Sequence, residues 1–468
     1  MNNIIKDLKK LNIKYKNICI DSRKVKAGDI FVALPGKQSD GILYVDQAIQ
    51  NGASIIISHA FTPTPSNIPL LVSKDIHTDL HALCRWIYND PWEKIQTVAI
   101  TGTNGKTSIS YILESIAKAN RYATGVIGTV NYRFRDTVIA KEQYTTPPPP
   151  DIYQLGQIFK NEKVDLSIIE ASSQGLDQGR LDHIPIQIAI FTNLTREHLD
   201  YHQSMEKYLH AKKKLFDQLS PKSFAVIEEN TPYFQELLQD CSAKVLTYGF
   251  SEKADIQGVP KDKQCMDIFY SNKYLYTIDH HFLGDYNLNN ILASLATSHI
   301  LGFMPSNIQK AFRERIVIPG RLEHIEVNKR NVFIDYAHTP DAFEKTLKTL
   351  HEDCPQEMWT VFGCGGNRDI GKRSQMGKIA ENHSDHIILT SDNPRHEKPL
   401  EIIKDILKGI DKKESIHIIE EREKAISTAL KLSSEGDYVL IAGRGHETSQ
   451  EISGVKYFLS DRHILKNL

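Results

Sequence analysis

The chain is 468 residues long, which suits roughly three domains, and its 40% hydrophobic and 25% charged residues are typical of a globular protein. Its formal net charge is −1, so overall charge gives no reason to expect a nucleic-acid or membrane partner. Segment 1–17 is polar and lysine-rich, without the apolar core of a signal peptide, and no stretch approaches the ~18 apolar residues of a membrane span. The six cysteines are scattered, which fits a reducing cytoplasm.

Short apolar strands alternate with helical stretches in the first segment of the chain. We predict strands at residues 30–33, 54–58 and 70–72, and helices at residues 44–51 and 75–88. The turn sequence Asn89-Asp90-Pro91 then favours a boundary, so we expect a first domain over residues 1–90.

The second segment opens with a phosphate-binding loop. Residues 98–107 read V-A-I-T-G-T-N-G-K-T, an apolar strand followed by a glycine turn, and an apolar helical pattern follows. Backbone N–H groups at such a turn bind phosphate, Lys106 reaches the terminal phosphates and Thr107 ligates Mg²⁺. Ile100 stands where a full Walker loop has glycine, so the loop is a tighter variant, and a chance turn is the structural alternative. The candidate ATP ligands are Gly102, Thr103, Asn104, Gly105, Lys106, Thr107 and Ser108.

The remaining strands predict an α/β protein of three domains. In the second segment they lie at residues 166–169, 188–191 and 224–227, and this central P-loop mononucleotide-binding domain spans residues 91–322. In the third segment, strands at residues 332–336, 359–362, 386–389, 417–419 and 438–442 alternate with helices near 340–350, 374–383, 399–409 and 421–433. This alternation predicts a Rossmann-like doubly wound sheet over residues 323–468.

Polar clusters follow nearly every predicted strand, at the edge where doubly wound sheets bind ligands. Glu170 begins the cluster after strand 166–169, and His198 lies in the run that follows strand 188–191. Each cluster alone can be a capped turn, and a lone histidine is usually structural. Beside the nucleotide, however, Glu170 and His198 can supply oxygen and nitrogen ligands to a second Mg²⁺.

Several motifs in combination resemble the Mur ligase family, the ATP-dependent ligases that build the peptide of the bacterial cell-wall precursor. They are D-S-R at 21–23, G-D-I-F-V-A at 28–33, T-N-L-T-R-E-H-L-D-Y-H at 192–202, D-Y-A-H-T-P-D at 335–341, F-G-C-G-G-N-R-D at 362–369 and D-N-P-R at 392–395. The resemblance covers almost the whole chain and is strongest with the branch that adds the third residue of the peptide. It implies a cytoplasmic enzyme of peptidoglycan synthesis, needed for cell shape and cell division. We expect a monomer with no nucleic-acid or membrane partner.

The resemblance implies that the reaction passes through an acyl phosphate. The D-glutamyl carboxylate of UDP-N-acetylmuramoyl-L-alanyl-D-glutamate (UDP-MurNAc-L-Ala-D-Glu) attacks the γ-phosphate of ATP, and the incoming amine then displaces phosphate. Lys106, Thr107 and two Mg²⁺ ions would supply the positioning and charge neutralisation that phosphoryl transfer needs. The resemblance also assigns Asn290, Arg321 and Asp335 to ATP, which therefore lies between the second and third domains.

Lys212, in the run H-A-K-K-K-L-F at 210–216, has the pattern of a solvated basic helix face. The family resemblance instead implies a carbamylated lysine, whose two anionic oxygens can bind Mg²⁺ as an ammonium cannot. The resemblance gives catalytic roles to Lys106, Glu170, His198 and Lys212, and metal ligation to Thr107, Glu170, His198 and carbamylated Lys212. For the UDP-linked substrate it points to Ile20, Ser22, Lys37, Gln38, Ser39, Tyr144, Thr145, Thr146, Ser172, Gln178 and Arg180.

The D-N-P-R motif bears on which amino acid is added. meso-Diaminopimelate and L-lysine differ by one distal carboxylate, so a site for meso-diaminopimelate needs a cation to pair with it. Arg395 supplies that cation and Glu447 suits the distal ammonium, although a turn with a surface arginine, or a site for L-lysine, is the alternative. By resemblance, the residues that bind meso-diaminopimelate are Arg368, Asp392, Asn393, Pro394, Arg395, Gly443 and Glu447.

Three positions depart from the family pattern. Tyr144 stands where asparagine is common, Lys398 stands at an acidic position, and 228–230 read E-E-N instead of N-x-D-D. A folylpolyglutamate synthase-like ligase is the nearest enzymatic alternative, but D-N-P-R and the first segment argue against it. A P-loop ATPase coupled to movement or nucleic acid is disfavoured by the near-neutral charge. The intact Lys106 and Glu170 argue against a non-catalytic scaffold.

Overall fold

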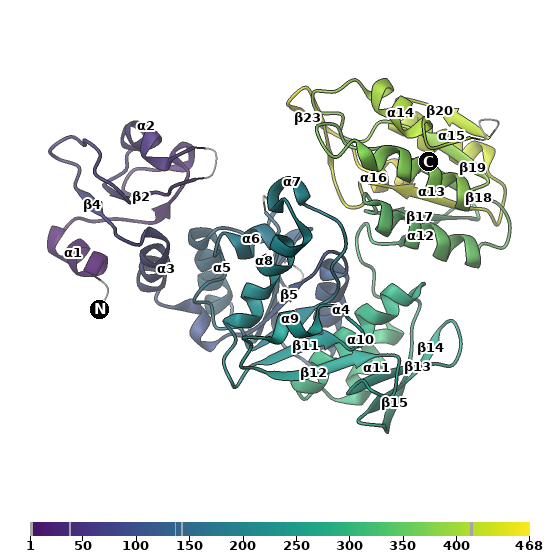
Figure 1. The fold of residues 1–468 in the computed structure, drawn as a ribbon, viewed down its shortest axis with the longest axis horizontal. Helices are drawn as coiled ribbons and strands as arrows, with labels where there is room; N and C mark the ends of the chain where they lie inside the picture. Colours follow the sequence, from purple (N-terminus) through teal and green to yellow (C-terminus); the bar gives the residue numbers. More distant parts are fainter. Residues whose placement is uncertain (1–2, 37–38, 136, 142–143, 412–414) are drawn as a thin grey trace.

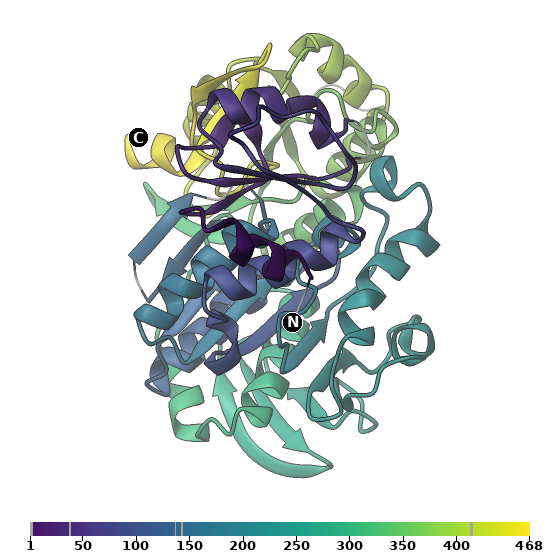
Figure 2. The ribbon, with the colours of Figure 1, turned by 90° about the vertical axis from the view of Figure 1, so that its left-hand side faces the viewer.

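The computed structural model describes residues 3–36, 39–135, 137–141, 144–411 and 415–468, and it contains three large sheets that follow one another along the chain (Figure 1). Helices cover these sheets, which confirms the predicted α/β class. Figures 1 and 2 both place the N-terminal and C-terminal sheets on the same side of the central one. None of the described helices has the length and apolar character that a membrane span requires.

The N-terminal sheet has four parallel strands in the order β1-β2-β3-β4. Its two middle strands are buried along their whole length, as expected for apolar strands with both faces covered. Its elements are α1 (Asn3–Leu11), β1 (Ile18–Cys19), β2 (Ile30–Ala33), α2 (Val45–Gln50), β3 (Ile55–Ser58), β4 (Leu70–Val72) and α3 (Ile76–Ile87), with 3₁₀ turns at Ser22–Lys24 and Gly41–Tyr44.

The central sheet has eleven strands in the order β15-β14-β13-β12-β11-β10-β5-β9-β6-β7-β8. Its strands are β5 (Gln96–Thr101), β6 (Thr124–Ile127), β7 (Asn131–Phe134), β8 (Thr137–Lys141), β9 (Leu166–Glu170), β10 (Ile188–Phe191), β11 (Phe224–Glu228), β12 (Lys244–Gly249), β13 (Ile256–Pro260), β14 (Cys265–Tyr270) and β15 (Lys273–Asp279). Its helices are α4 (Lys106–Ala119), α5 (Pro149–Asn161), α6 (Ser173–Asp177), α7 (Leu199–His202), α8 (Met205–Asp217), α9 (Phe234–Leu238), α10 (Asp285–Ile300) and α11 (Pro305–Arg313). The antiparallel extensions β6-β7-β8 and β13-β14-β15 have no counterpart in the sequence-based prediction.

The C-terminal sheet has the order β16-β17-β21-β18-β19-β20, and only its edge strand β16 is antiparallel. Separate apolar clusters cover its two faces, as the prediction of a doubly wound sheet requires. Its elements are β16 (Glu323–Val327), β17 (Arg330–Asp335), α12 (Pro340–Asp353), β18 (Met358–Phe362), α13 (Gly371–His383), β19 (His386–Leu389), α14 (Pro399–Leu407), β20 (Ile416–Ile418), α15 (Arg422–Leu432), β21 (Tyr438–Ala442), the hairpin of β22 (Ser449–Ile452) and β23 (Val455–Phe458), and α16 (Asp461–Lys466).

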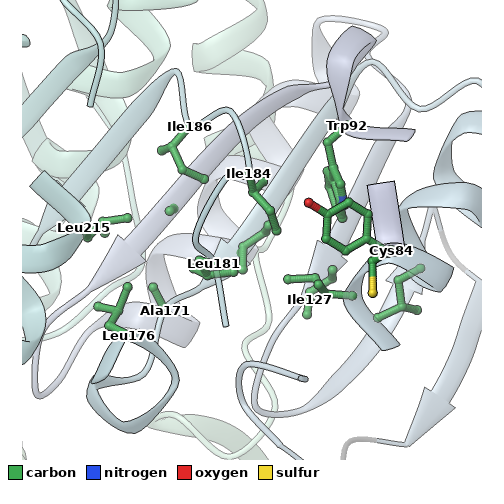
Figure 3. Packing of buried hydrophobic residues seen from close by; sticks show 14 of the residues in the cluster. Cys84, Trp92, Ile127, Ala171, Leu176, Leu181, Ile184, Ile186 and Leu215 are labelled. Atoms are coloured by element: carbon green, nitrogen blue, oxygen red, sulfur yellow. The ribbon is translucent and has the colours of Figure 1, made fainter. Parts of the chain in front are cut away.

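One hydrophobic core joins the first two segments of the chain. Cys84 of α3 and Trp92, in the 3₁₀ turn Pro91–Lys94, belong to the same buried cluster as Ile127 of the central sheet (Figure 3). A Cβ at Gly156 of α5 would lie only 2.6 Å from the Trp92 indole, so this helix and the indole are in close contact. The shared core therefore packs α3 against the central domain, while the domain boundaries at residues 90 and 322 stay predictions.

Candidate active site

The phosphate-binding loop joins β5 to α4 in a conformation that needs glycine at two positions. Gly102 and Gly105 have φ values of 145° and 91°, which side chains other than glycine rarely adopt. A Cβ at Gly105 would lie 2.4 Å from Asn290 Oδ1 of α10. The loop is also held by the segment after β10, since Asn104 N donates to Asn193 Oδ1 at 3.0 Å. Backbone and neighbouring elements thus fix the shape of this loop before any ligand binds.

Lys106 folds back over this loop. Its Nζ donates to Gly102 O at 2.7 Å and to Thr103 O at 2.8 Å. Burial lowers the pKa of Lys106, an effect that the carboxylates of Glu197 and Glu170 oppose. Carbonyl oxygens only partly replace the water that the ammonium has lost, so an anion entering the loop would be a stronger partner for it.

Glu170, at the end of β9, is a buried carboxylate surrounded by hydroxyl groups. It is 1% exposed, and its Oε2 accepts hydrogen bonds from Thr107 Oγ1 at 3.0 Å and Thr129 Oγ1 at 2.6 Å. Ser110 Oγ lies 3.4 Å from Oε1. Among the described residues, no basic side chain forms an ion pair with this carboxylate. A buried anion that forms no ion pair with the described residues fits a site that receives a cation together with its ligand.

No group of three or more His, Cys, Asp or Glu side chains in the described part of the chain could hold a metal ion unaided. Thr107 and Glu170 are hydrogen-bonded to each other, and Thr107 lines the same pocket as His198 and Lys212. A sparse set of protein oxygens, completed by ligand oxygens and water, is the arrangement that Mg²⁺ prefers. The four predicted metal ligands therefore fit Mg²⁺ better than a metal that needs a full cage of protein ligands.

Lys212 on α8 is not the solvated surface residue that its lysine-rich run first indicates. It is 1% exposed, and its Nζ lies 4.5 Å from the centre of the Tyr208 ring. No described residue is a hydrogen-bond or ion-pair partner of this amine. Burial, reinforced by the charge of Lys106, holds the pKa of Lys212 well below that of an ordinary lysine.

Glu197 is a site residue that the sequence analysis missed. Its Oε1 lies 3.4 Å from His338 Nε2 of the C-terminal domain, and its Oε2 lies 3.7 Å from His198 Nε2. Burial raises the pKa of Glu197, but His338, His198 and Lys106 outweigh that effect and hold the pKa below its usual range. His198 itself has a left-handed backbone with φ 54°, which is uncommon for a residue other than glycine.

One pocket of about 250 Å³ collects residues from both sides of the interdomain boundary. Asp335 is buried there, accepts hydrogen bonds from Leu322 N and Ala337 N, and has its pKa raised by burial. Arg321 stacks on Tyr336 at 4.6 Å. The predicted ATP ligands that line this pocket are Gly102, Thr103, Asn104, Gly105, Lys106, Thr107, Ser108, Asn290, Arg321 and Asp335, so the structure brings all ten together.

A second, larger pocket of about 920 Å³ lies between the N-terminal sheet and the start of α5. Ile20, Ser22, Ser39 and Tyr144 line it, as predicted for the UDP-linked substrate. Three basic residues that the prediction did not include also line it, namely Arg23, Lys24 and Lys26. Lys37 and Gln38 lie outside the described residues.

The other predicted contacts for the UDP-linked substrate are not among the residues that line the large pocket. Thr145 and Ser172 line the pocket of the phosphate loop. Thr146 is fully buried, and its Oγ1 bonds Glu170 O at 2.8 Å and Ser172 Oγ at 3.0 Å. Gln178 and Arg180 are hydrogen-bonded to each other beside Tyr144. Contacts from Tyr144 through Arg180 and Thr146 to Ser172 thus connect the lining of the large pocket with that of the phosphate-loop pocket.

The predicted amino-acid site forms a polar cluster in the C-terminal domain. Asn393 Nδ2 donates to Glu447 Oε2 at 2.9 Å, and Asn393 Oδ1 accepts from Arg444, a fully buried arginine that the sequence analysis did not single out. Burial, together with nearby Asp392, raises the pKa of Glu447. Arg395 Nη1 donates to Gly366 O at 2.7 Å.

Gly443 and Arg368 complete the predicted set in different surroundings. A Cβ at Gly443 would lie 2.7 Å from Asp392 Oδ2, so glycine permits a close approach there. Pro394 continues the same turn, and a Cβ at Gly366 would meet its carbonyl oxygen at 2.0 Å. Arg368 is exposed, and its Nη1 lies 3.9 Å from Asp200 Oδ2 of the central domain. The Arg368 side of the cluster therefore faces α7 of the central domain.

Three family models match successive parts of the chain. They are described as Mur ligase family, catalytic domain, over residues 14–85, Mur ligase middle domain over residues 100–298, and Mur ligase, glutamate ligase domain, over residues 320–445. A relative from Aquifex aeolicus, named UDP-N-acetylmuramoyl-L-alanyl-D-glutamate--2,6-diaminopimelate ligase, is 36% identical and covers 99% of this chain and 95% of its own length.

Solved structures agree with this similarity. A structure of a ligase with the same name is 31% identical, with a TM-score of 0.68, and the match covers 97% of this chain and 94% of that one. A Mycobacterium tuberculosis folylpolyglutamate synthase complexed with ADP and AMPPCP has a TM-score of 0.66, but it is 17% identical, and the match covers 78% of this chain and 92% of that one. The second similarity concerns the fold alone.

Proposed function

The chain belongs to the Mur ligase family, and we propose that it uses ATP to join meso-diaminopimelate to the D-glutamate of UDP-MurNAc-L-Ala-D-Glu. One observation carries most of this proposal. A single pocket places the phosphate loop and Lys212 of the central domain opposite Arg321 and Asp335. The reaction belongs to the cytoplasmic synthesis of the peptidoglycan precursor, and the enzyme acts as a monomer without a nucleic-acid or membrane partner.

The proposed chemistry has two steps. An oxygen of the D-glutamyl carboxylate attacks the γ-phosphorus of ATP, which forms an acyl phosphate and releases ADP. The amine of the incoming amino acid then attacks the acyl carbon, loses a proton and expels phosphate, which leaves an amide. Lys106 exchanges its two carbonyl contacts for phosphate oxygens, and the glycine loop presents backbone N–H groups that hold the phosphates in line.

Thr107, Glu170, His198 and Lys212 would hold two Mg²⁺ ions. When bound, Mg²⁺ neutralises charge on the phosphate oxygens. Lys212 fits the carbamate assignment because its amine is buried without a hydrogen-bond or ion-pair partner among the described residues, and because burial holds its pKa well below that of an ordinary lysine. The amine nitrogen bonds to the carbon of CO₂ and releases a proton, which converts a buried amine into an anion next to the ammonium of Lys106.

The C-terminal cluster supports meso-diaminopimelate as the amino acid. Glu447 is held by Asn393 and offers a carboxylate to an ammonium. Arg395 reaches Gly366 O and lies 3.7 Å from Glu451, so part of its hydrogen-bonding capacity is left for a second carboxylate. L-lysine, which has no distal carboxylate, would leave this arginine without that partner, and discrimination should be strong for this reason.

Release of ADP tests the proposed function. Purified enzyme with ATP, Mg²⁺ and UDP-MurNAc-L-Ala-D-Glu should release ADP at a sustained rate when meso-diaminopimelate is added, and much more slowly with L-lysine. A preference for L-lysine would overturn the assignment of the amino acid. ADP release that needs neither the UDP-linked substrate nor an amino acid would overturn the ligase itself.

A further inference from the structure

Among the described residues, the Arg180 guanidinium has no anionic partner. Arg180 follows Gly179, which has φ 65°, in the turn after α6. Its Nε and Nη2 donate to Gln178 Oε1 at 3.0 and 2.7 Å, and its Nη1 donates to Thr146 O at 2.5 Å. All of these acceptors are neutral, and no described carboxylate lies within ion-pair distance. Burial lowers the pKa of Arg180, as expected for a cation that has lost part of its water.

Tyr144 covers one face of this guanidinium. The centre of the Tyr144 ring lies 4.9 Å from Arg180 Cζ, within the range of a cation–π contact. The tyrosine is 45% exposed and lines the large pocket of the N-terminal sheet. Its backbone is anchored to the central sheet, because Tyr132 OH donates to Tyr144 O at 2.5 Å. The backbone that carries the ring is therefore held in place, and the ring lies between the large pocket and Arg180.

This stacking leaves hydrogen-bond donors of the guanidinium free. A guanidinium has five N–H groups in one plane, and three of them are used by Gln178 and Thr146. Among the described residues, one N–H therefore remains without an acceptor on each terminal nitrogen, and each can donate to an oxygen of a carboxylate or a phosphate. A ring on the flat face fixes the plane of the guanidinium without occupying these edge donors.

We propose that Tyr144 is a positioning residue for the UDP-linked substrate, whose ring holds Arg180 in the orientation that receives an anionic group of this substrate. The inference rests on the proposed function, since it concerns the same substrate. Tyr144 acts through Arg180, and its aromatic ring rather than its hydroxyl does so, because the contact with Arg180 is made by the ring face.

Steady-state kinetics of the full-length enzyme tests this role. Tyr144→Leu should raise the KM for UDP-MurNAc-L-Ala-D-Glu by about 3- to 10-fold, the equivalent of one cation–π contact. The kcat and the KM values for ATP and for the amino acid should stay within about twofold, since the ring touches none of those sites. Tyr144→Phe keeps the ring and should therefore have the wild-type KM for this substrate. Tyr274→Leu, at an exposed tyrosine on β15, is the matched control for loss of a surface aromatic ring.

A double-mutant cycle shows whether the effect passes through Arg180. In an Arg180→Lys background, Tyr144→Leu should change the KM by less than about twofold, because the planar guanidinium is already gone. An equal effect in both backgrounds would overturn the proposal, since the ring would then act on the substrate directly. A Tyr144→Phe variant as impaired as Tyr144→Leu would overturn it as well, because the hydroxyl would be the active group.

Direct binding separates this inference from the proposed function. Calorimetric titration of UDP-MurNAc-L-Ala-D-Glu without ATP should give a dissociation constant that rises with Tyr144→Leu by the same factor as the KM. If wild-type enzyme binds this substrate but releases no ADP, the proposed function fails, and the ratio of dissociation constants still decides the role of Tyr144. If the wild type is active and Tyr144→Leu changes neither KM nor binding, the positioning role alone fails. If the wild type does not bind the substrate, both fail.

Discussion

Replacement of Glu170 by glutamine should separate activity from stability. The carboxylate is 1% exposed and accepts hydrogen bonds from hydroxyl groups, so burying its charge costs several kcal/mol, which the nearby charge of Lys106 offsets only in part because the two side chains form no ion pair. Glutamine has the same shape, and its amide oxygen can keep the bonds from Thr107 and Thr129. Its amide N–H can donate to a hydroxyl such as that of Ser110, since hydroxyls also accept. The free energy of unfolding should therefore stay within about 1 kcal/mol of wild type, a Tm shift below about 4 °C.

The activity of this variant, unlike its stability, should fall strongly. Loss of a charge that stabilises the phosphoryl-transfer site should lower kcat by about 10²- to 10³-fold. ADP release with both substrates measures this effect on kcat. Thermal unfolding with and without Mg²⁺ and ATP measures how much the bound ligands stabilise each protein. Saturation at about 100 times Kd stabilises wild type by about 2.7 kcal/mol, and the variant should gain clearly less.

Glu228→Gln is the matched control, because Glu228 also ends a central strand but does not line the pocket of the phosphate loop. It should keep both kcat and the ligand-induced gain in Tm. A Glu170→Gln enzyme with kcat within about threefold of wild type, or with the full gain in Tm, would refute the reasoning. A large loss of Tm without ligand would refute the claim that the charge is kept for function.

Three further predictions concern other parts of the protein. Lys212→Ala should abolish ligase activity, and short carboxylates should restore part of it. Acidification of the wild-type enzyme should remove roughly 44 mass units, the mass of CO₂. Full activity in the variant would rule out a carbamate at Lys212. Arg395→Ala should lower kcat/KM for meso-diaminopimelate by about 100-fold or more but leave the low rate with L-lysine within about threefold, and equal losses would contradict pairing with the distal carboxylate. Burial and the charge of Arg321 lower the pKa of His446 to about 4, so the unfolded chain takes up this proton near pH 6.5 and the folded chain does not. The free energy of unfolding should therefore fall as pH drops from about 6.5 to 4, by up to about 3 kcal/mol, and His446→Gln should remove that part of the fall in denaturant titrations.

The parallel strands could be predicted because their apolar runs are continuous. Ile188–Phe191 and Tyr438–Ala442 are buried on both faces of their sheets, and the predicted bounds match the structure at both ends. The antiparallel strands β7 and β14 could not be predicted in this way. Their sequences N-Y-R-F and C-M-D-I-F-Y mix polar and apolar residues. One face of β14 is partly solvated, and the arginine of β7 is buried in an ion pair with Glu114.

The site residues also differ in how well the sequence predicts them. The phosphate loop could be predicted because strand, glycine turn and helix are contiguous, so all of the chemistry lies within ten residues. The contact between Glu197 and His338 could not, because it joins residues far apart in sequence through the arrangement of two domains. Burial of Lys212 was also hidden, since its lysine neighbours give the pattern of a solvated face, whereas the structure turns it inward beside Tyr208.

Transfer of an oxygen isotope tests most directly whether ATP activates the D-glutamyl carboxylate. UDP-MurNAc-L-Ala-D-Glu labelled with ¹⁸O in that carboxylate should donate one labelled oxygen to the released phosphate when meso-diaminopimelate is the amine. The label moves because the carboxylate oxygen bridges carbon and phosphorus in the acyl phosphate and leaves with phosphate when the amine attacks. Phosphorus NMR of the product resolves labelled from unlabelled phosphate. Singly labelled phosphate in step with amide formation is the predicted result, and unlabelled phosphate would contradict the acyl-phosphate mechanism.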